Sequence, residues 1–346
     1  EYTTPPLNSY DRLLCAILQP RRQLRHYLSQ LGEDYTLIPG SCLALGGTDT
    51  FYRSDPQNPY HSYIEQTYGT QVVTASIHIN IGIGDLEELI RACRLVRMEA
   101  PLYLALSASS PFLNGQVTGY HSSRWQMFPK TPQEVPLFTS HGHFVQWTEE
   151  QLTLGTMQNV RHLWSAVRPN GDNRPHNLNR LELRICDLVT NPLSLLAIVA
   201  LLEARLQQML ADPTLDPLQQ SQLTPSELLT LADQNEISAA VSSLDSTLHH
   251  WRDGRAIAAR EWIEELYQSV QPEAKYQGFA CFLPPLRKIL REGNQAQQWL
   301  TQYEQGKSAP TIVQEAILQT ETEEAMLAQD LCLPSTRAGD EMLSLV

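Results

Sequence analysis

The sequence predicts an α+β protein whose strands lie in its first half and whose second half is helical. Residues 76–82 and 179–188 alternate apolar and polar side chains, as strands with one buried face do. After Pro192 the pattern changes to long segments with helical periodicity. We therefore divide the chain into a sheet-containing portion (1–190), a helical portion packed on it as one structural unit (191–330) and a tail (331–346).

In the first portion, apolar spacing predicts a helix over 11–31, and a composition rich in Gly, Pro, Asp and Asn predicts a loop over 41–68. A strand is expected over 71–83. Asp85 is a good helix N-cap, so a helix should follow to Met98, and Pro101 should begin another short helix through Leu106.

In the second portion, the sequence predicts a long apolar helix over 193–210 after Pro192. Thr224 and Glu227 match a capping box, which predicts a helix from there to His250. Further helices are expected at 256–270, 284–304 and 311–330.

Composition excludes several classes of protein. The net charge of −13 over 346 residues argues against a general binder of nucleic acid or of anionic membranes. No apolar run reaches the ~18 residues of a membrane span. The six cysteines are far apart, which predicts neither a zinc site nor a disulfide framework and fits a reducing cytoplasm. The P-loop, G-x-G-x-x-G and H-E-x-x-H signatures are absent.

Polar residues on the two alternating segments are the first candidates for a site. His78 lies on the polar side of its segment, and imidazole can bind a metal ion or a phosphate. The alternative is a half-buried histidine that hydrogen-bonds a neighbour. Glu182 is either a metal-binding carboxylate or the partner of Arg180 or Arg184 in an ion pair on the sheet.

Two arginines are candidates for anion binding. Arg124 and Arg168 each offer a rigid fork of donors that matches a carboxylate or a phosphate, and a surface salt bridge is the alternative for both. Glu1 is a further carboxylate. The chain begins at Glu1 without an initiator methionine, and we interpret the sequence as N-terminally truncated.

Four ordered motifs carry a resemblance to a known family. They are SIHINIG (76–82), LALSASSPF (104–112), TGYHSSR (118–124) and LELRICD (181–187). Together they resemble glutamate–cysteine ligase family 2, and more narrowly its cyanobacterial type, over roughly residues 1 to 260.

The resemblance implies a glutamine-synthetase-like fold, in which a curved, mostly antiparallel sheet forms a funnel with helices packed outside it. It also implies ATP-dependent joining of the γ-carboxylate of L-glutamate to the amine of L-cysteine, with Mg²⁺, as the first step of glutathione synthesis. The partners would be these two amino acids and ATP, and the oligomeric state stays open.

Residue by residue, the resemblance implies that Glu1, His78 and Glu182 hold metal. Arg124 and Arg168 would act in catalysis, and Arg184 and Asn80 would bind the nucleotide. Ser110, Thr118 and Arg124 would bind glutamate.

Two departures from the family's pattern keep other functions open. Related carboxylate–amine ligases often have H-x-H where this chain has His78 and Asn80, and the upstream acidic strand of the family is not in the sequence. A ligase with a different amine acceptor, or a non-catalytic protein that binds glutamate or nucleotide, are therefore the alternatives.

Overall fold

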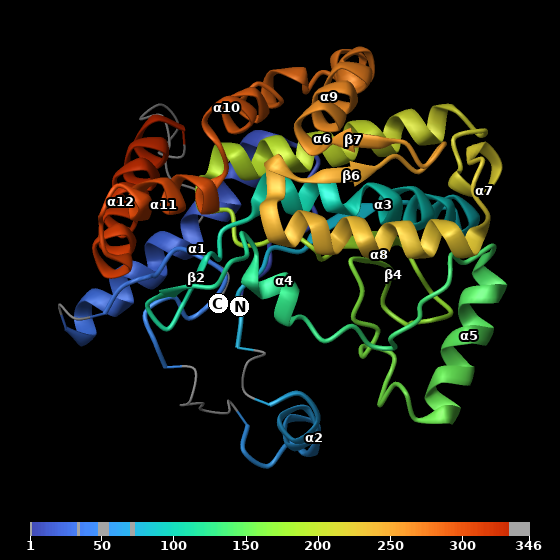
Figure 1. Cartoon of the computed structure of the whole chain (residues 1–346), viewed down its shortest axis with the longest axis horizontal. Coiled ribbons are helices and arrows are strands. Elements are labelled where there is room, and N and C mark those ends of the chain that lie inside the picture. Colours follow the sequence, from blue (N-terminus) through green and yellow to red (C-terminus); the bar gives the residue numbers. More distant parts are fainter. Residues whose placement is uncertain (1, 33–34, 48–54, 70–72, 332–346) are drawn as a thin grey trace, which may run out of the picture.

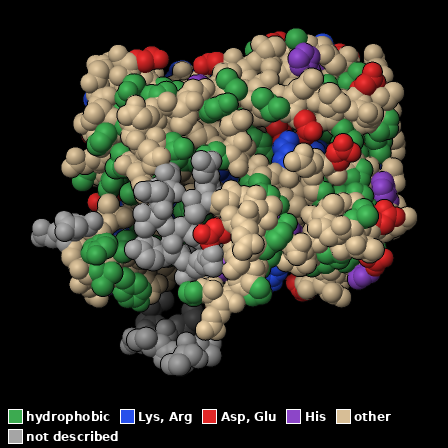
Figure 2. Space-filling model, turned by 60° about the horizontal axis from the view of Figure 1, so that its bottom comes forward, with side chains coloured by type: hydrophobic (Ala, Val, Ile, Leu, Met, Phe, Trp, Pro, Cys, Tyr) green, Lys and Arg blue, Asp and Glu red, His purple; other side chains and the backbone are tan. Residues whose placement is uncertain are grey.

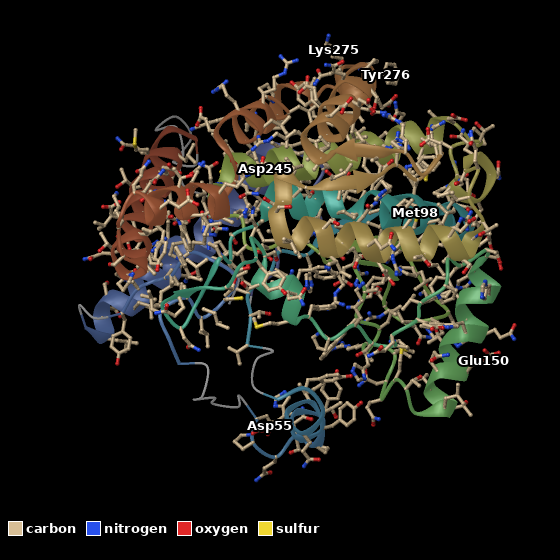
Figure 3. The ribbon with its side chains drawn as sticks, in the orientation of Figure 1. Asp55, Met98, Glu150, Asp245, Lys275 and Tyr276 are labelled. Carbon is tan, nitrogen blue, oxygen red and sulfur yellow. The ribbon has the colours of Figure 1, made fainter. Side chains whose placement is uncertain are left out.

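The computed structural model of the chain describes residues 2–32, 35–47, 55–69 and 73–331. At its centre lies helix α3 (Leu86–Ser107), which Figure 1 shows running between α8 (Pro225–Ser242) and α6 (Pro192–Ala211). Every residue of α3 from Leu89 to Ser107 is buried. The side chain of Met98 lies in the middle of this packing, whereas Tyr276, which is 85% exposed, projects outward at the top of Figure 3.

The helix α3 is continuous, so the prediction of an end at Met98 and a new helix at Pro101 is wrong. Its start is as expected, because the Asp85 carboxylate accepts hydrogen bonds from the main-chain N–H groups of Glu87 and Glu88. Pro101 costs the helix a main-chain hydrogen bond. Burial on all sides compensates, since the neighbouring helices fix the path of the backbone through this point.

Charged residues of α3 are buried in pairs that tie it to its neighbours. Glu99 binds Arg205 of α6, with Nε–Oε2 at 2.9 Å, and accepts a hydrogen bond from the indole of Trp251. Arg94 binds Asp216, which also caps the short helix α7 (Pro217–Gln220). A buried charge is tolerated when it is paired and hydrogen-bonded in this way.

The main sheet has three antiparallel strands in the order β1 (Ile79–Gly82), β5 (Arg180–Leu183) and β4 (Val167–Asn170). Its apolar residues, such as Leu181 and Leu183, are fully buried on the side of α3. The register places Asn80, Glu182 and Arg168 in one row across the three strands. The alternation seen in the sequence therefore produces one apolar and one polar face.

The sheet is smaller than the sequence suggested. Of the strand expected over 71–83, the structure describes residues 73–83; among these, ladder pairing runs from Ile79 to Gly82, with one further bridge between Ser76 and Asp187. The remaining sheets of the described residues are two hairpins, β2 (Phe112–Leu113) with β3 (Gln116–Val117) and β6 (Thr247–His249) with β7 (Ala256–Ala258). The α+β class is confirmed, but the described residues do not form the wide funnel-shaped sheet.

The first portion holds α1 (Tyr10–Leu31), α4 (Ser123–Met127) and α5 (His141–Leu154), and the second holds α9 (Ala259–Tyr276), α10 (Pro285–Glu292), α11 (Gln295–Glu304) and α12 (Ala309–Leu331). The 3-10 turns η1 (Ser243–Asp245) and η2 (Ala280–Phe282) complete the list. Helices α1, α6, α9 and α12 lie where the sequence predicted them, whereas α4 and α5 were not predicted. Buried residues of both portions enter one large hydrophobic core.

Three helices differ from the prediction in their presence or in their ends, and the local sequence accounts for each difference. The segment 41–68 contains a helix, α2 (Pro59–Tyr68), whose N-cap is Asn58. The helix expected to reach His250 ends at Ser242, because Ser243 has a φ of 46°, in the left-handed region. The helix expected over 284–304 is interrupted at Gly293, where φ is 87°, and Asn294 caps α11.

The structure bears on two expectations from the sequence, the absence of a membrane span and the absence of a disulfide. Among the described residues, α6 is long and apolar enough to cross a membrane, but 67% of this stretch is buried inside the protein, as in a core helix. Cys15 is disulfide-bonded, so the expectation of no disulfide is wrong there, whereas Cys42, Cys93, Cys186 and Cys281 are free thiols.

Thr224→Ala should lower the free energy of unfolding by about 1 kcal/mol. The Thr224 hydroxyl accepts the N–H of Glu227, and the Glu227 carboxylate accepts the N–H of Thr224, so the change breaks the capping box of α8. Thr230→Ala is the control, because its exposed hydroxyl bonds only to Ser226 of the same helix. Urea unfolding that shows equal losses for both variants would contradict the role of the cap.

Candidate active site

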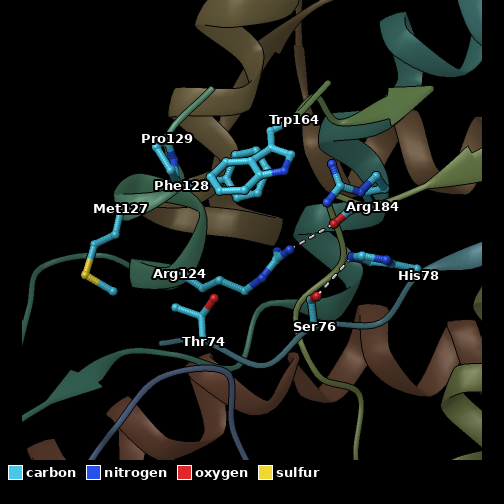
Figure 4. A pocket seen from close by; sticks show the side chains of 9 residues that line it. All are labelled: Thr74, Ser76, His78, Arg124, Met127, Phe128, Pro129, Trp164 and Arg184. Atoms are coloured by element: carbon cyan, nitrogen blue, oxygen red, sulfur yellow. Dashed lines mark hydrogen bonds between the residues drawn. The ribbon is translucent and has the colours of Figure 1, made fainter. Parts of the chain in front are cut away.

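A cavity of about 210 Å³ lies at the end of the main sheet and has two unlike walls (Figure 4). One wall is polar and cationic, and it consists of Thr74, Ser76, His78, Arg124 and Arg184. The other is apolar and aromatic, and it consists of Met127, Phe128, Pro129 and Trp164. Such a cavity suits a small ligand that carries an anionic group at one end and an apolar part at the other.

Glu182 is the counter-ion of the polar face of the sheet. It is 5% exposed. Its Oε2 accepts hydrogen bonds from Arg168 Nε at 2.7 Å and from Asn170 Nδ2 at 2.9 Å, and its Oε1 lies 3.1 Å from His78 Nδ1 and 3.6 Å from Arg184 Nε. Burial raises the pKa of Glu182, but the hydrogen bond from His78 and the ion pair with Arg168 outweigh it and hold the pKa well below its usual range.

His78 is oriented by this carboxylate. Because Glu182 is ionised, His78 Nδ1 carries the proton and donates it, which leaves Nε2 as an acceptor 3.2 Å from the hydroxyl of Ser76. Burial lowers the pKa of His78, and the charges of Arg184 and Arg124 act in the same direction against the opposing effect of Glu182. The imidazole is therefore neutral at pH 7.

Arg124 projects from α4 into the wall of the cavity (Figure 4). Its Nη1 donates to the carbonyl of Ile185 at 3.0 Å and its Nη2 to the carbonyl of Arg184 at 2.9 Å, and it is 2% exposed. Its Nε is buried and has no acceptor. Arg184 Nε and Arg174 Nη1 are also buried and donate no hydrogen bond.

The site is a concentration of positive charge in an acidic protein. Four guanidinium groups, of Arg124, Arg168, Arg174 and Arg184, stand against the two carboxylates of Glu182 and Asp187. Burial and the nearby charge of Arg168 lower the pKa of Arg184 to about 9 and that of Arg174 to about 10. On the face shown in Figure 2, Lys and Arg side chains reach the surface at only a few points. Arg124, Arg168 and Arg184 are buried.

These features favour an anionic ligand. Buried guanidinium donors without acceptors, next to an excess of positive charge, are satisfied by a phosphate or carboxylate. The residues fit a Mg²⁺ ion less well. Both oxygens of Glu182 are already occupied by donors, two arginines flank it, and the described residues contain no group of three or more His, Cys, Asp or Glu side chains that could hold a metal.

The structure brings together His78, Arg124 and Arg184 at the cavity, with Glu182 and Arg168 beside them on the sheet. Asn80 is exposed and lies opposite Glu182 in the ladder, outside the cavity wall.

Two of the expected substrate-binding residues lie behind the wall. Ser110 donates to Asp187 and accepts from the N–H of Arg124, and Thr118 bonds within its own loop and to Ser123. Ser110 therefore supports the backbone of Arg124, whereas Thr118 contacts Ser123, the residue before Arg124. Glu1 lies outside the described residues.

Sequence reasoning missed the aromatic wall and Asp187. Trp164 and Phe128 lie in loops without periodicity, so no pattern marked them. Trp164 also contacts His162, which is packed edge-on against Tyr60 and Tyr63 of α2. Asp187 had a signal: it stands in the same alternating register as Leu183 and Ile185, on the side that should be apolar.

Comparison with solved structures shows the fold. The crystal structure of the glutamate–cysteine ligase of Francisella tularensis, in complex with AMP, has the same fold: the TM-score is 0.63 over 96% of this chain and 85% of that one, at 12% identity. The fold is thus that of a known ligase.

Sequence comparison defines the family. A protein of Sorangium cellulosum, named "Putative glutamate--cysteine ligase 2", is 31% identical over 247 residues, which are 70% of this chain and 63% of that protein. A protein of the same name in Solibacter usitatus is 27% identical over 310 residues, 87% of this chain and 77% of that protein. The model of glutamate–cysteine ligase family 2 matches residues 1–326, and the chain belongs to this family.

Glu182→Gln should reduce the acid sensitivity of the fold. The pKa of Glu182 is lower in the folded protein than in the unfolded chain, so its ionised form stabilises the fold above the unfolded value of about 4.3 and this contribution is lost as the pH falls below it. Between pH 7 and pH 3 the wild type should lose on the order of 2 kcal/mol more than the variant. Urea unfolding at both pH values measures this, and identical losses would exclude the ion pairs as its source.

Proposed function

We propose that the chain catalyses ATP-dependent ligation of the γ-carboxylate of L-glutamate to the amine of L-cysteine. The observation that supports this is the arginine-rich cavity with an apolar wall, in a chain of this family. The product would be γ-glutamylcysteine, the first intermediate of glutathione synthesis, formed in the cytoplasm.

The chemistry has two balanced steps. A carboxylate is a poor acyl donor, so an oxygen of the γ-carboxylate first attacks the γ-phosphorus of ATP, and ADP leaves. The amine nitrogen then attacks the carbonyl carbon of the acyl phosphate, inorganic phosphate leaves, and the amine loses a proton. Both steps depend on positioning and on neutralising negative charge more than on acid–base chemistry.

Arg124 and Arg184 are suited to the anionic groups of this reaction. Their free Nε donors are buried beside the cavity, where a low local dielectric strengthens their attraction for an oxyanion. Arg168 holds Glu182 and through it fixes the neighbouring charges. At about 210 Å³ the cavity is smaller than most ligand pockets. It therefore suits an amino acid or a single phosphate group, with the rest of the nucleotide outside it.

Mg²⁺ accompanies ATP in this proposal as the ion that screens its phosphates. Because Glu182 and His78 are engaged with each other and with Arg168, we assign the ion no ligand among the described residues. Glu1 remains a proposed metal ligand.

His78 is better suited to accept a proton than to bind metal. Its neutral imidazole presents Nε2 at the cavity, and Glu182 stabilises the imidazolium that would form. His78 Nε2 can therefore accept the proton that the attacking amine loses.

Two other functions are open to experiment. A different amine could replace cysteine, because the aromatic wall imposes no requirement for a thiol. A protein that binds glutamate or nucleotide without turnover is the second. Release of ADP, measured with ATP, Mg²⁺, glutamate and a panel of amines, separates them. Faster release with cysteine than with serine or alanine supports our proposal, equal rates with non-thiol amines favour the first alternative, and binding of ATP without turnover favours the second.

Arg124→Lys should lower kcat/KM by about 100-fold, because a lysine keeps the charge but loses the fork that bonds two carbonyls and a substrate oxyanion. Arg255→Lys is the matched control, since Arg255 is exposed in the β6–β7 turn and pairs with Asp253 and Glu265. Its kcat/KM should stay within about twofold of wild type. An Arg124→Lys variant as active as this control would remove Arg124 from the reaction.

His78→Gln should flatten the acidic limb of the pH–rate profile, because the wild-type base is lost to protonation as the pH falls through its lowered pKa. The dependence of the rate on Mg²⁺ should not change. A variant whose pH profile is intact but whose Mg²⁺ requirement rises would return His78 to the role of a metal ligand.

A further inference from the structure

Asp187, just beyond β5, is a fully buried carboxylate whose donors come from two other segments of the chain, 109–110 and 122–124. Its Oδ2 accepts the main-chain N–H of Ser109 at 3.0 Å and the hydroxyl of Ser110 at 2.8 Å. Its Oδ1 accepts the hydroxyl of Ser122 at 2.9 Å and lies 3.6 Å from Nη1 of Arg124. It is 0% exposed and does not line the cavity.

The contacts of Asp187 surround Arg124. The hydroxyl of Ser110 also accepts the main-chain N–H of Arg124, at 3.2 Å, and Ser122 is the N-cap of the helix that carries Arg124. The guanidinium of Arg124 in turn bonds the carbonyls of the two residues that precede Cys186. Both the backbone and the side chain of Arg124 are thus held against the end of β5 by one cluster.

We propose that Asp187 is a positioning residue, which fixes Arg124 in the wall of the cavity before substrate arrives. This rests on the proposed function of Arg124 in ligation. A guanidinium stabilises developing charge best when its donors are held in place in advance, so that little reorganisation is needed during the reaction. Two neutral carbonyls fix the direction of the guanidinium, and the charge of Asp187, 3.6 Å from Nη1, holds it in that position.

The rival reading is that Asp187 is only a buried structural ion pair. The protein contains such a pair for comparison. Asp216 is 2% exposed, binds Arg94 and caps α7, and neither residue lines the cavity. Asp187→Asn and Asp216→Asn therefore remove the same charge from equally buried pairs, one beside the cavity wall and one away from it.

Asp187→Asn should lower kcat by at least about 30-fold and change KM for glutamate and ATP by less than about threefold. The asparagine keeps the shape and can still accept from Ser109 and Ser110, while Arg184 and Arg168 still attract the substrates. Asp216→Asn should lower the melting temperature to a similar extent with kcat within about twofold of wild type. A kcat of Asp187→Asn within threefold of wild type, a loss confined to KM, or an equal loss in both variants would overturn the proposal.

A second measurement needs no turnover. Asp187→Ala leaves a hole of the size of a carboxylate, lined by the N–H of Ser109, two serine hydroxyls and Arg124. Formate should fill it and raise the melting temperature by at least about 3 °C over chloride at equal ionic strength, with a shift below about 1 °C in wild type. Formate should also restore part of kcat. No formate-specific shift in Asp187→Ala would overturn the proposal.

These readouts separate failure of the inference from failure of the proposed function. If the wild-type protein releases ADP with none of the amines, the proposed function fails. The formate shift then still decides whether the cluster around Asp187 is an anion seat that holds Arg124. If the wild type is active and Asp187→Asn is as active, the inference alone fails.

Discussion

The site depends on the burial of several arginines beside a small sheet, where the described residues supply two carboxylates, Glu182 and Asp187, to balance them. Glu182 pairs with Arg168 and Arg184 on the polar face, and Asp187 stands against Arg124 at the strand's end. Burying a charge is unfavourable unless it is paired and hydrogen-bonded. Among the described residues, four guanidinium groups stand against two carboxylates, so the pairing is incomplete, and three of their buried guanidinium nitrogens donate no hydrogen bond. The proposed ligand anion would balance this charge.

The helical portion holds the loop that carries Arg124 through a set of hydrogen bonds around Ser243. Asn294 at the start of α11 donates to the carbonyl of Ala105 at the end of α3 and to the hydroxyl of Ser243, which in turn bonds His121 Nδ1 at 2.7 Å. His121 lies three residues before Arg124. The main-chain N–H groups of His121 and Ser122 also donate to the carbonyls at the C-terminal end of α8. The loop that carries Arg124 is therefore clamped between the sheet and the helices, although Asn294 lies 170 residues further along the chain.

The sequence predicted much of this, and physical reasons account for what it did not predict. Alternation in two segments located the polar face and His78 and Glu182 on it, because the period of a strand is a local property. The ordered motifs located Arg124. Ladder pairing ends early and α3 runs through Pro101 because tertiary packing overrides local propensity. Trp164 enters the cavity wall from a loop, and the roles of Ser110 and Thr118 depend on which neighbour each hydroxyl meets, neither of which a pattern records.

Asp187 shows how a break in a pattern can be more informative than the pattern itself. Asp187 continues the alternation of Leu181, Leu183 and Ile185 and so lies on the apolar side of the segment, where an isolated carboxylate is unfavourable. Its presence there required partners, and the structure supplies three donors and a guanidinium. A carboxylate on the apolar side of a strand, next to a cationic cavity, therefore indicates a residue that holds the cavity's arginine in place without lining the cavity. The proposed anion site is compatible with a net charge of −13, because the attraction at the cavity is set within a few ångströms by buried arginines, which salt and distant surface charge screen much less.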